Sequence, residues 1–206
     1  MPKVTSAIPI MFDVIRDDEL ADVTLNFSDN RDVMSATRWR VPRELQNVPG
    51  MQVRAADARE FAKLAAKRWK HYRDTSTAAF SLPQLQKMIA ADPEGEFCFH
   101  LKVTADWFPA SLGGAMVRRT WCHHLMIDFL FVHPSISGKT IQVRNVGIQT
   151  LRCICLIARE LGCDRIWGEA TRDSAPFYAR QLGQEVKDQF QIDKLQIRRL
   201  SSELLA

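Results

Sequence analysis

The stretch at residues 124–132 constrains the fold of this chain most, because it is apolar on both faces of a strand. Leu125, Ile127, Phe129 and Phe131 share one parity, and Met126, Leu130 and Val132 share the other. Strands with two apolar faces lie inside a sheet and not at its edge. His133-Pro134 then ends the strand, since proline cannot donate to the ladder. The sequence therefore predicts a central strand here.

A helix is predicted after a short polar loop. Apolar residues recur at helical spacing from Ile148 to Leu161, and Gly162 is a suitable C-cap. The helix opens with Arg144-Asn145-Val146-Gly147. Because the amides of the first turn have no partners within a helix, a strand that leads through a glycine-containing turn into a helix can hold a phosphate.

The rest of the chain alternates between helical and strand periods. We expect an element order of strand, two helices, three strands, helix, strand, helix and two strands from residue 51 to residue 200. The strands are predicted at residues 51–54, 97–103, 113–121, 124–132, 165–170, 185–190 and 194–200. The first helix is expected to follow a capping box of Asp57 and Glu60, and the second to span residues 81–91.

The central strand and the helix after it carry a family resemblance. Leu130-Phe131-Val132-His133-Pro134, followed by Arg144-x-x-Gly147-x-Gln149, resembles the acyl-CoA signature of the Gcn5-related N-acetyltransferases (GNAT), Arg/Gln-x-x-Gly-x-Gly/Ala. Two departures stand out, because Gln149 occupies the place of a small residue and residues 137–143 look like an insertion. The resemblance implies coenzyme contacts at Leu130, Phe131, Val132, Arg144, Asn145, Val146, Gly147, Ile148, Gln149 and Ser174.

A second stretch is similar to another signature of the same family. Residues 171–183, Thr-Arg-Asp-Ser-Ala-Pro-Phe-Tyr-Ala-Arg-Gln-Leu-Gly, resemble Asn-x-x-Ala-x-x-Phe/Leu-Tyr-x-Lys-x-Gly. Thr171 stands where asparagine is usual, and Ser174 where alanine is usual. By its match to the family tyrosine, Tyr178 is the candidate general acid that protonates the leaving thiolate.

The general base has two candidates. Asp128 is an ionisable residue inside an apolar strand, where an unpaired carboxylate is costly, so it needs a partner or a role. Glu169 lies near the end of the following strand. A structural Asp128 paired with an arginine, and a Glu169 that is only a surface residue, remain the alternatives. Cys122 is not expected to form a thiol–imidazole pair with His123 or His124, because neighbouring residues on a strand face opposite ways.

The resemblance implies an α/β (α+β) GNAT acyl-CoA N-acyltransferase fold, with a mixed central sheet of about six to seven strands flanked by about four helices. Residues 51–206 would form this domain. Residues 1–50 would form an N-terminal extension that serves as an accessory hairpin, a dimerisation element or a partner-binding arm.

The implied function is transfer of an acetyl group from acetyl-CoA to an amine by direct attack in a ternary complex. The acceptor is a small molecule or a peptide. Two alternatives stay open. One is an inactive binding or regulatory module, in which Gln149 and residues 137–143 close the coenzyme site. The other is a toxin-like acetyltransferase that acts on aminoacyl-tRNA, for which a basic rim around the cleft is expected.

Composition limits the partners and the compartment. The formal net charge of +4 over 206 residues suits an anionic coenzyme. It does not indicate a nucleic-acid partner, apart from the transfer RNA of the toxin-like alternative. The five cysteines contain no C-x-x-C pair, which predicts reduced thiols in a cytoplasmic protein and no metal site. We expect neither a signal peptide nor a membrane span.

Overall fold

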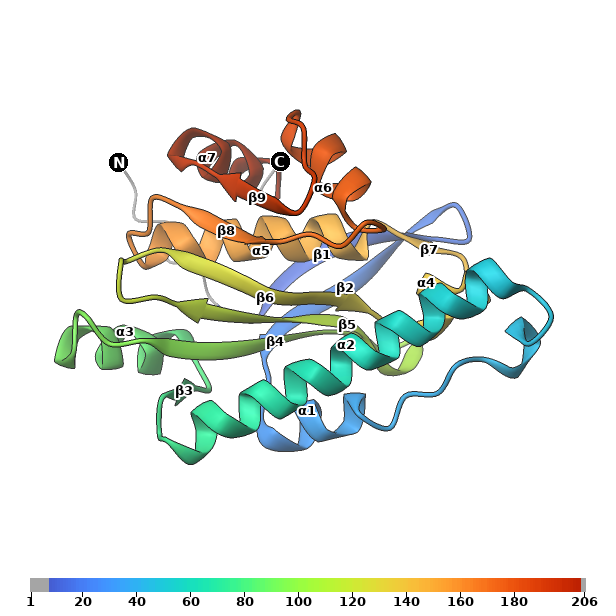
Figure 1. Cartoon of the computed structure of the whole chain (residues 1–206), viewed down its shortest axis with the longest axis horizontal. Coiled ribbons are helices and arrows are strands. Elements are labelled where there is room, and N and C mark those ends of the chain that lie inside the picture. Colours follow the sequence, from blue (N-terminus) through green and yellow to red (C-terminus); the bar gives the residue numbers. More distant parts are fainter. Residues whose placement is uncertain (1–7, 205–206) are drawn as a thin grey trace.

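The computed structural model describes residues 8–204, and one mixed sheet of nine strands runs through it (Figure 1). Residues 1–7 of the predicted N-terminal extension and residues 205–206 of the predicted domain lie outside the described residues. The strands are β1 (Ile10–Arg16), β2 (Glu19–Phe27), β3 (Ala78–Ala79), β4 (Phe97–Ala105), β5 (Phe108–Arg119), β6 (Leu125–Val132), β7 (Val143–Arg144), β8 (Ile166–Glu169) and β9 (Gln189–Ile192). The helices are α1 (Asn30–Ala36), α2 (Pro49–Asp74), α3 (Leu82–Ala91), α4 (Pro134–Ser137), α5 (Val146–Glu160), α6 (Ala175–Leu182) and α7 (Lys194–Glu203), with a short 3-10 helix at Arg43–Leu45.

The strand order is β7-β1-β2-β4-β5-β6-β8-β9, with β3 paired to β4. The pairs β6–β8 and β3–β4 are parallel, and the other pairs are antiparallel. β6 therefore lies inside the sheet, as its two apolar faces predict. The predicted α/β fold with a mixed central sheet is confirmed, with more strands and helices than expected.

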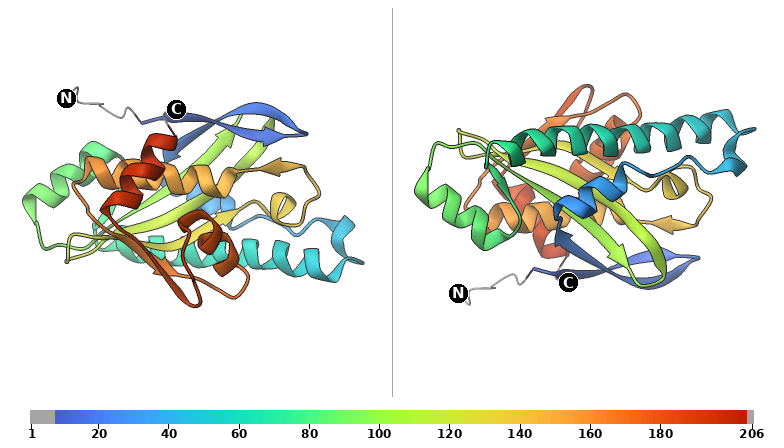
Figure 2. Two further views of the ribbon diagram at one scale, coloured as in Figure 1. Left: turned by 90° about the horizontal axis from the view of Figure 1, so that it is seen from above. Right: turned by 90° about the horizontal axis from the view of Figure 1, so that it is seen from below.

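Helices cover both faces of the sheet (Figure 2). α1 and α2 lie on one face, where alanines of α2 and Trp69 pack against Met116 and Phe131. α5 lies on the other face and is backed by α7 (Figures 1 and 2). Its buried stripe, which includes Leu151 and Ile154, belongs to the larger core cluster. The sheet is thus sandwiched between two helical layers, which hold β6 rigidly in place.

The hairpin of β1 and β2 is built into the same sheet. β2 pairs with β4 through Thr24↔Thr104 to Phe27↔Leu101. Val14, Val23 and Leu25 are buried in the larger core cluster. The predicted division of the chain at residue 50 stays a prediction, although in space the hairpin is continuous with the strands that follow it.

Two of the predicted strands are wrong, and a third is shifted along the chain. Residues 51–54 lie in α2, which starts at Pro49, and Asp57 and Glu60 lie inside this helix and form no capping box at its start. The alternating apolar residues Met51 and Val53 suggest a buried strand face, but Val53 is 55% exposed. Residues 194–200 lie in α7, which begins with a capping box of Asp193 and Gln196. Finally, only residues 189–192 form a strand near the predicted one at 185–190.

Residues 137–143, expected as an insertion, connect α4 to β7. The hydroxyl of Ser137 donates to the carbonyl of Arg54 at 3.0 Å, and Gly138 packs against Leu45 and Ala55. β7 then pairs with β1 at the edge of the sheet. These contacts fix the segment against α2 on one side and against the N-terminal hairpin on the other.

Candidate active site

Strands β6 and β8 part in the middle of the sheet. They pair from Leu125↔Ile166 to Ile127↔Gly168, and β8 ends one residue later. β6 continues to Val132 with β5 alone as its neighbour. A Cβ at Gly168 would lie 2.8 Å from the carbonyl oxygen of Ile127, so only glycine fits at this last pair. Beyond it, one edge of the β6 backbone faces a groove instead of a strand.

A β-bulge lies at the same point. Met116 pairs with Phe129 and Val117 with Ile127, which leaves Asp128 as the extra residue of β6. A bulge bends its strand and re-aims the side chains next to it. Asp128 therefore sits where the strand bends.

The carboxylate of Asp128 is paired twice. Arg118 donates Nε and Nη2 to it at 2.7 and 2.8 Å, and Arg68 donates Nη1 at 2.7 Å. The Asp128 side chain has no exposed surface. Burial alone would lower the pKa of Arg118, but hydrogen bonds with Asp128 and the charges around it raise that pKa above its ordinary value. The structure thus gives Asp128 its arginine partners, which was the structural alternative for this residue.

The Arg118 guanidinium also reaches a second carboxylate. Its Nη1 lies 3.2 Å from each carboxylate oxygen of Glu96, which accepts a hydrogen bond from the Tyr72 hydroxyl. Burial, and then the hydrogen bond to Glu96, raise the pKa of Tyr72 to about 12. The two carboxylates therefore hold Arg118 from both sides.

A cavity of about 530 Å³ opens between the parted strands. Its walls include all three predicted catalytic residues, Asp128, Glu169 and Tyr178, together with Leu130 and Ser174 of the predicted coenzyme set. Phe61, Ile127, Phe129, Ala170, Thr171, Asp188 and Gln189 complete the lining. The structure therefore brings together residues that lie 50 positions apart in the sequence.

Tyr178 is buried in α6 at the wall of this cavity. Its ring stacks on Phe190 with centroids 3.8 Å apart and meets the edge of Phe177. Burial raises the pKa of the Tyr178 phenol well above its ordinary value. A tyrosine keeps its proton at neutral pH even at its ordinary pKa, so the hydroxyl is in the state that a general acid needs.

A second cavity of about 520 Å³ continues the groove along β6. Leu130, Phe131 and Val132 line it, so the strand part of the predicted coenzyme set faces one groove. Phe61, Leu130, Thr171 and Ser174 line both cavities. The two cavities therefore form a continuous groove between α2 on one side and the start of α6 on the other.

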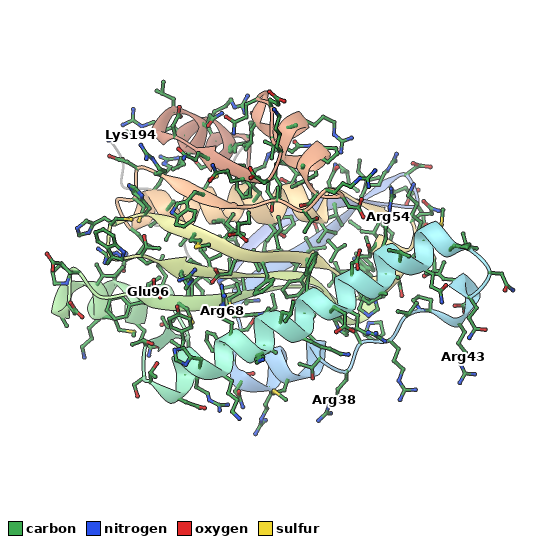
Figure 3. The ribbon with its side chains drawn as sticks, in the orientation of Figure 1. Arg38, Arg43, Arg54, Arg68, Glu96 and Lys194 are labelled. Carbon is green, nitrogen blue, oxygen red and sulfur yellow. The ribbon has the colours of Figure 1, made fainter. Side chains whose placement is uncertain are left out.

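Three arginines from separate elements line the second cavity. They are Arg54, Arg172 and Arg180, with Asp57 and Asp173 as the carboxylates there. Within residues 8–204, none of the three guanidinium groups pairs with a carboxylate. Figure 3 shows Arg54 and Arg68 projecting from the side of α2 that faces the sheet. This part of the groove is therefore suited to an anionic ligand.

The start of α5 lies beside α6. Asn145 has a left-handed backbone, with φ 73°, and provides no side-chain cap. A Cβ at Gly147 would lie 3.7 Å from the Phe177 ring, which shows how near the two helices approach. The uncapped amides of this first turn are thus close to the elements that form the groove.

The other predicted residues around the helix start point elsewhere. Arg144 pairs with Asp18 at the β1–β2 turn, and the side-chain Nε2 of Gln149 donates to the backbone carbonyl of Asp13 at 3.0 Å. Val146 and Ile148 are buried in the core. Gln149 therefore turns its bulk toward β1, and not toward α6.

Sequence reasoning missed several groove residues. Arg54 and Phe61 come from α2, whose first turns were predicted as a strand, and Asp188 lies just before β9. His71 and Tyr72 lie in the last turns of α2 and line a further cavity. Phe61 is half-buried against the smaller core cluster, and its helical spacing with Ala65 and Trp69 is the signal that places it on the sheet side of a helix.

The expectation for Cys122 is also wrong. Thr120 to His124 form a turn between β5 and β6, with a hydrogen bond from the Thr120 amide to the His124 carbonyl. The turn brings Cys122 Sγ to 3.4 Å from His124 Nδ1, and to 3.1 Å from the Thr120 hydroxyl. Residues two apart share a contact here because they do not lie on one extended strand.

Neither a metal site nor a membrane helix is found in the part of the chain that the structure describes. No group of three or more histidine, cysteine or carboxylate side chains in residues 8–204 is arranged to hold a metal ion. No helix within that range is long and apolar enough to cross a membrane.

Comparisons with known proteins return solved structures only. No model of a known protein family matches the chain, and no curated protein matches it in sequence. One similar structure is a nourseothricin acetyltransferase, at 22% identity over 43% of this chain, with a TM-score of 0.34. The chain matches 49% of the length of that protein.

Two further structures match over more of the chain. One is a protein from Desulfovibrio desulfuricans described as an acetyltransferase of the GNAT family, at 16% identity, over 84% of this chain and 99% of its own, with a TM-score of 0.48. The other is described as arylalkylamine N-acetyltransferase 7 of the yellow fever mosquito, at 13% identity, over 87% of this chain and 82% of its own, with a TM-score of 0.44. The chain's own topology is the mixed α/β architecture that the sequence predicts.

Proposed function

We propose that this chain is a cytoplasmic N-acetyltransferase, which transfers the acetyl group of acetyl-CoA to an amine within a ternary complex. One observation carries the proposal: a tyrosine, Tyr178, and a carboxylate, Glu169, line the same cavity at the parting of two strands. An acid and a base on opposite sides of a reacting thioester are what acyl transfer to an amine requires.

The residues of the groove fit acetyl-CoA as a co-substrate. The free backbone edge of β6 at Leu130, Phe131 and Val132 can hydrogen-bond to the amide-containing pantetheine arm. The amides at the start of α5 and the unpaired arginines of the second cavity suit the phosphates of the coenzyme. When bound, acetyl-CoA supplies the activated acyl group as a thioester.

Tyr178 and Glu169 take opposite roles in the proposed reaction. Glu169 accepts a proton from the amine, whose nitrogen forms the new C–N bond to the acyl carbon. Tyr178 donates its proton to the sulfur as the C–S bond breaks. The hydroxyl of a tyrosine carries its proton at neutral pH, so this donor is available there.

We assign Asp128 a positioning role. Arg118 and Arg68 occupy both oxygens of its carboxylate, so a proton could be accepted only after these ion pairs weaken. Glu169 is exposed and in no ion pair within residues 8–204. Of the two predicted base candidates, Glu169 is therefore the one whose carboxylate is available.

The first experiment measures coenzyme binding by thermal shift and by calorimetry. Acetyl-CoA is expected to stabilise the native chain more than adenosine diphosphate does, since the diphosphate lacks the pantetheine arm. Gly147→Glu should abolish this stabilisation, because it places a carboxylate beside the amides at the start of α5.

Gly50→Glu serves as the matched control. Gly50 lies in the first turn of α2, with open space around its Cβ position, so the same charge is added away from the groove. This variant should bind acetyl-CoA like the native chain. A native protein that binds no acetyl-CoA would contradict the enzyme proposal and would favour the recognition module.

A further inference from the structure

A third cavity lies on the far side of Asp128 from Glu169 and Tyr178. It has a volume of about 500 Å³ and opens between the C-terminal half of α2 and strands β5 and β6. Lys67, Arg68, His71 and Arg118 line it, and no carboxylate does. We call it the basic pocket. Figure 3 shows Arg68 on α2 at this side of the sheet.

The basic pocket and the catalytic cavity touch each other. Phe129 lines both of them. Asp128 lines the catalytic cavity, while its two ion-pair partners, Arg68 and Arg118, line the basic pocket. A molecule that lies along Phe129 can therefore reach both spaces at once.

The two spaces have opposite charge. The catalytic cavity is lined by the carboxylates of Glu169 and Asp188, besides the neutralised Asp128, and no lysine, arginine or histidine is among its described lining residues. The basic pocket shows the reverse pattern. Such a pair of neighbouring spaces complements a molecule with an ammonium group at one end and an anion at the other.

Two of the cations in the basic pocket have donors to spare. The guanidinium nitrogens of Arg118 already donate to Asp128, Glu96, the Tyr72 hydroxyl and Met126. Arg68 uses only Nη1, and Lys67 makes no ion pair within residues 8–204. Arg68 and Lys67 both line this pocket, so both can hydrogen-bond to one oxyanion there.

We propose that the basic pocket binds the anionic end of the acceptor, a carboxylate or a phosphate, while its amine lies against Glu169. The acceptor class is thus a small amine that also carries an oxyanion, such as an amino acid or an aminoalkyl phosphate. This inference rests on the proposed acetyltransferase function for the role of the amine, but the anion site stands on the pocket itself.

Matched acceptor pairs test the acceptor class. Phenylalanine is compared with phenylalanine amide, and phosphoethanolamine with ethanolamine, in acetyl transfer from acetyl-CoA. The anionic member of at least one pair should have a KM lower by about tenfold, which corresponds to ~1.4 kcal/mol. The pair that shows the preference tells whether the anion is a carboxylate or a phosphate. Equal KM values within both pairs would overturn the proposal.

Lys67→Glu should remove the preference for the anionic member. Lys70→Glu is the control, since Lys70 is exposed on the same helix and does not line the pocket. Acetyl-CoA affinity should be unchanged in both variants. A preference that survives in Lys67→Glu, or is lost equally in Lys70→Glu, contradicts the assignment.

A binding measurement separates this proposal from the enzyme proposal. Inorganic phosphate and acetate, each at constant ionic strength, are titrated into the native chain and into Lys67→Glu, and the melting temperature is followed. At least one anion should stabilise the native chain more than the variant, whether or not acetyl-CoA binds. If neither does, the anion site is refuted, even for a chain that proves to be an active acetyltransferase.

Discussion

Arg118 holds Asp128 through two nitrogens, with Nε 2.7 Å from one carboxylate oxygen and Nη2 2.8 Å from the other. Arg68, from a helix on the face of the sheet, completes the arrangement at 2.7 Å. The aspartate itself is the extra residue of a bulge. The bend in β6, and with it the opening of the groove, is therefore tied to α2 and β5 by charged hydrogen bonds.

Asp128→Asn should destabilise the fold strongly. The amide keeps the shape of the side chain but leaves Arg118, whose side chain is only 17% exposed, without its main counter-charge. Breaking a buried pair in this way costs about 3–5 kcal/mol. Urea unfolding of the variant and of the native chain measures the loss.

Glu60→Gln is the comparison for that measurement. Glu60 pairs with Arg59 and Lys63 on the exposed side of α2, and such surface pairs contribute little to stability. If Asp128→Asn costs no more than Glu60→Gln, the network around Asp128 does not stabilise the fold.

Tyr178→Phe should lower kcat by about 10²–10⁴-fold, because it removes the proposed proton donor. Its ring would still stack on Phe190, so the melting temperature should change little. Steady-state kinetics with acetyl-CoA give the rate. Tyr72→Phe removes the hydroxyl of the other tyrosine, which lines the basic pocket and not the catalytic cavity, so its effect should fall on the KM of the acceptor and leave kcat near the native value. Equal losses in the two variants would argue against Tyr178 as the acid.

Glu169→Gln should lower kcat/KM by about 10²-fold near neutral pH, since the amine then has no carboxylate to accept its proton. The deficit should shrink as the pH rises toward the pKa of the acceptor amine, because the amine loses its proton to solvent. A pH profile of kcat/KM for both proteins checks this. A deficit that stays constant with pH would leave Glu169 a binding residue.

His100 should make the protein less stable in acid. It is buried between Trp69 and Phe131, its Nδ1 lies 2.7 Å from the Ser28 hydroxyl, and burial lowers its pKa to about 3. The unfolded chain binds this proton near pH 6.5, so the stability present above that pH is lost as the pH falls toward 3. At pH 5 the loss from this group is on the order of 2 kcal/mol.

The measurement is urea unfolding of the native chain and of His100→Gln at several pH values. The pH dependence between 4 and 6.5 should be shallower in the variant. His133, whose pKa burial lowers to about 4, contributes in the same direction and remains in both proteins. Parallel profiles for the two proteins would show that His100 does not cause the acid sensitivity.

Local patterns predicted the core of the fold well. β6 and α5 follow from apolar periods of two and 3.6 residues, and α6 from its signature and its C-terminal Gly183. The prediction from apolar spacing failed where the same residues fit both a strand period of two and a helical period of 3.6. In α7, Leu195 and Ile197 suggest a strand, but only Ile197, Leu200 and Ser201 are buried, and the capping box at Asp193 was the signal for a helix.

The site could be predicted only in part, because half of its walls come from distant elements. Tyr178 and Leu130 lie in recognisable motifs, whereas Arg68 meets Asp128 across 60 positions of sequence. Which face of a helix docks on which strand depends on packing, and local periodicity does not encode it. The arginine partners of Asp128 and the basic pocket therefore emerge only in three dimensions.

The parting of β6 and β8 has a consequence for how the groove can change over evolution. A ligand that lies along β6 is met by peptide groups, which every amino acid except proline supplies in the same form. Side chains on this strand can then be exchanged for others of similar size without loss of those contacts. In a groove built in this way, only the few residues around the reacting atoms need particular side chains. The rest of the sequence around the groove can diverge widely while the ligand contacts are kept.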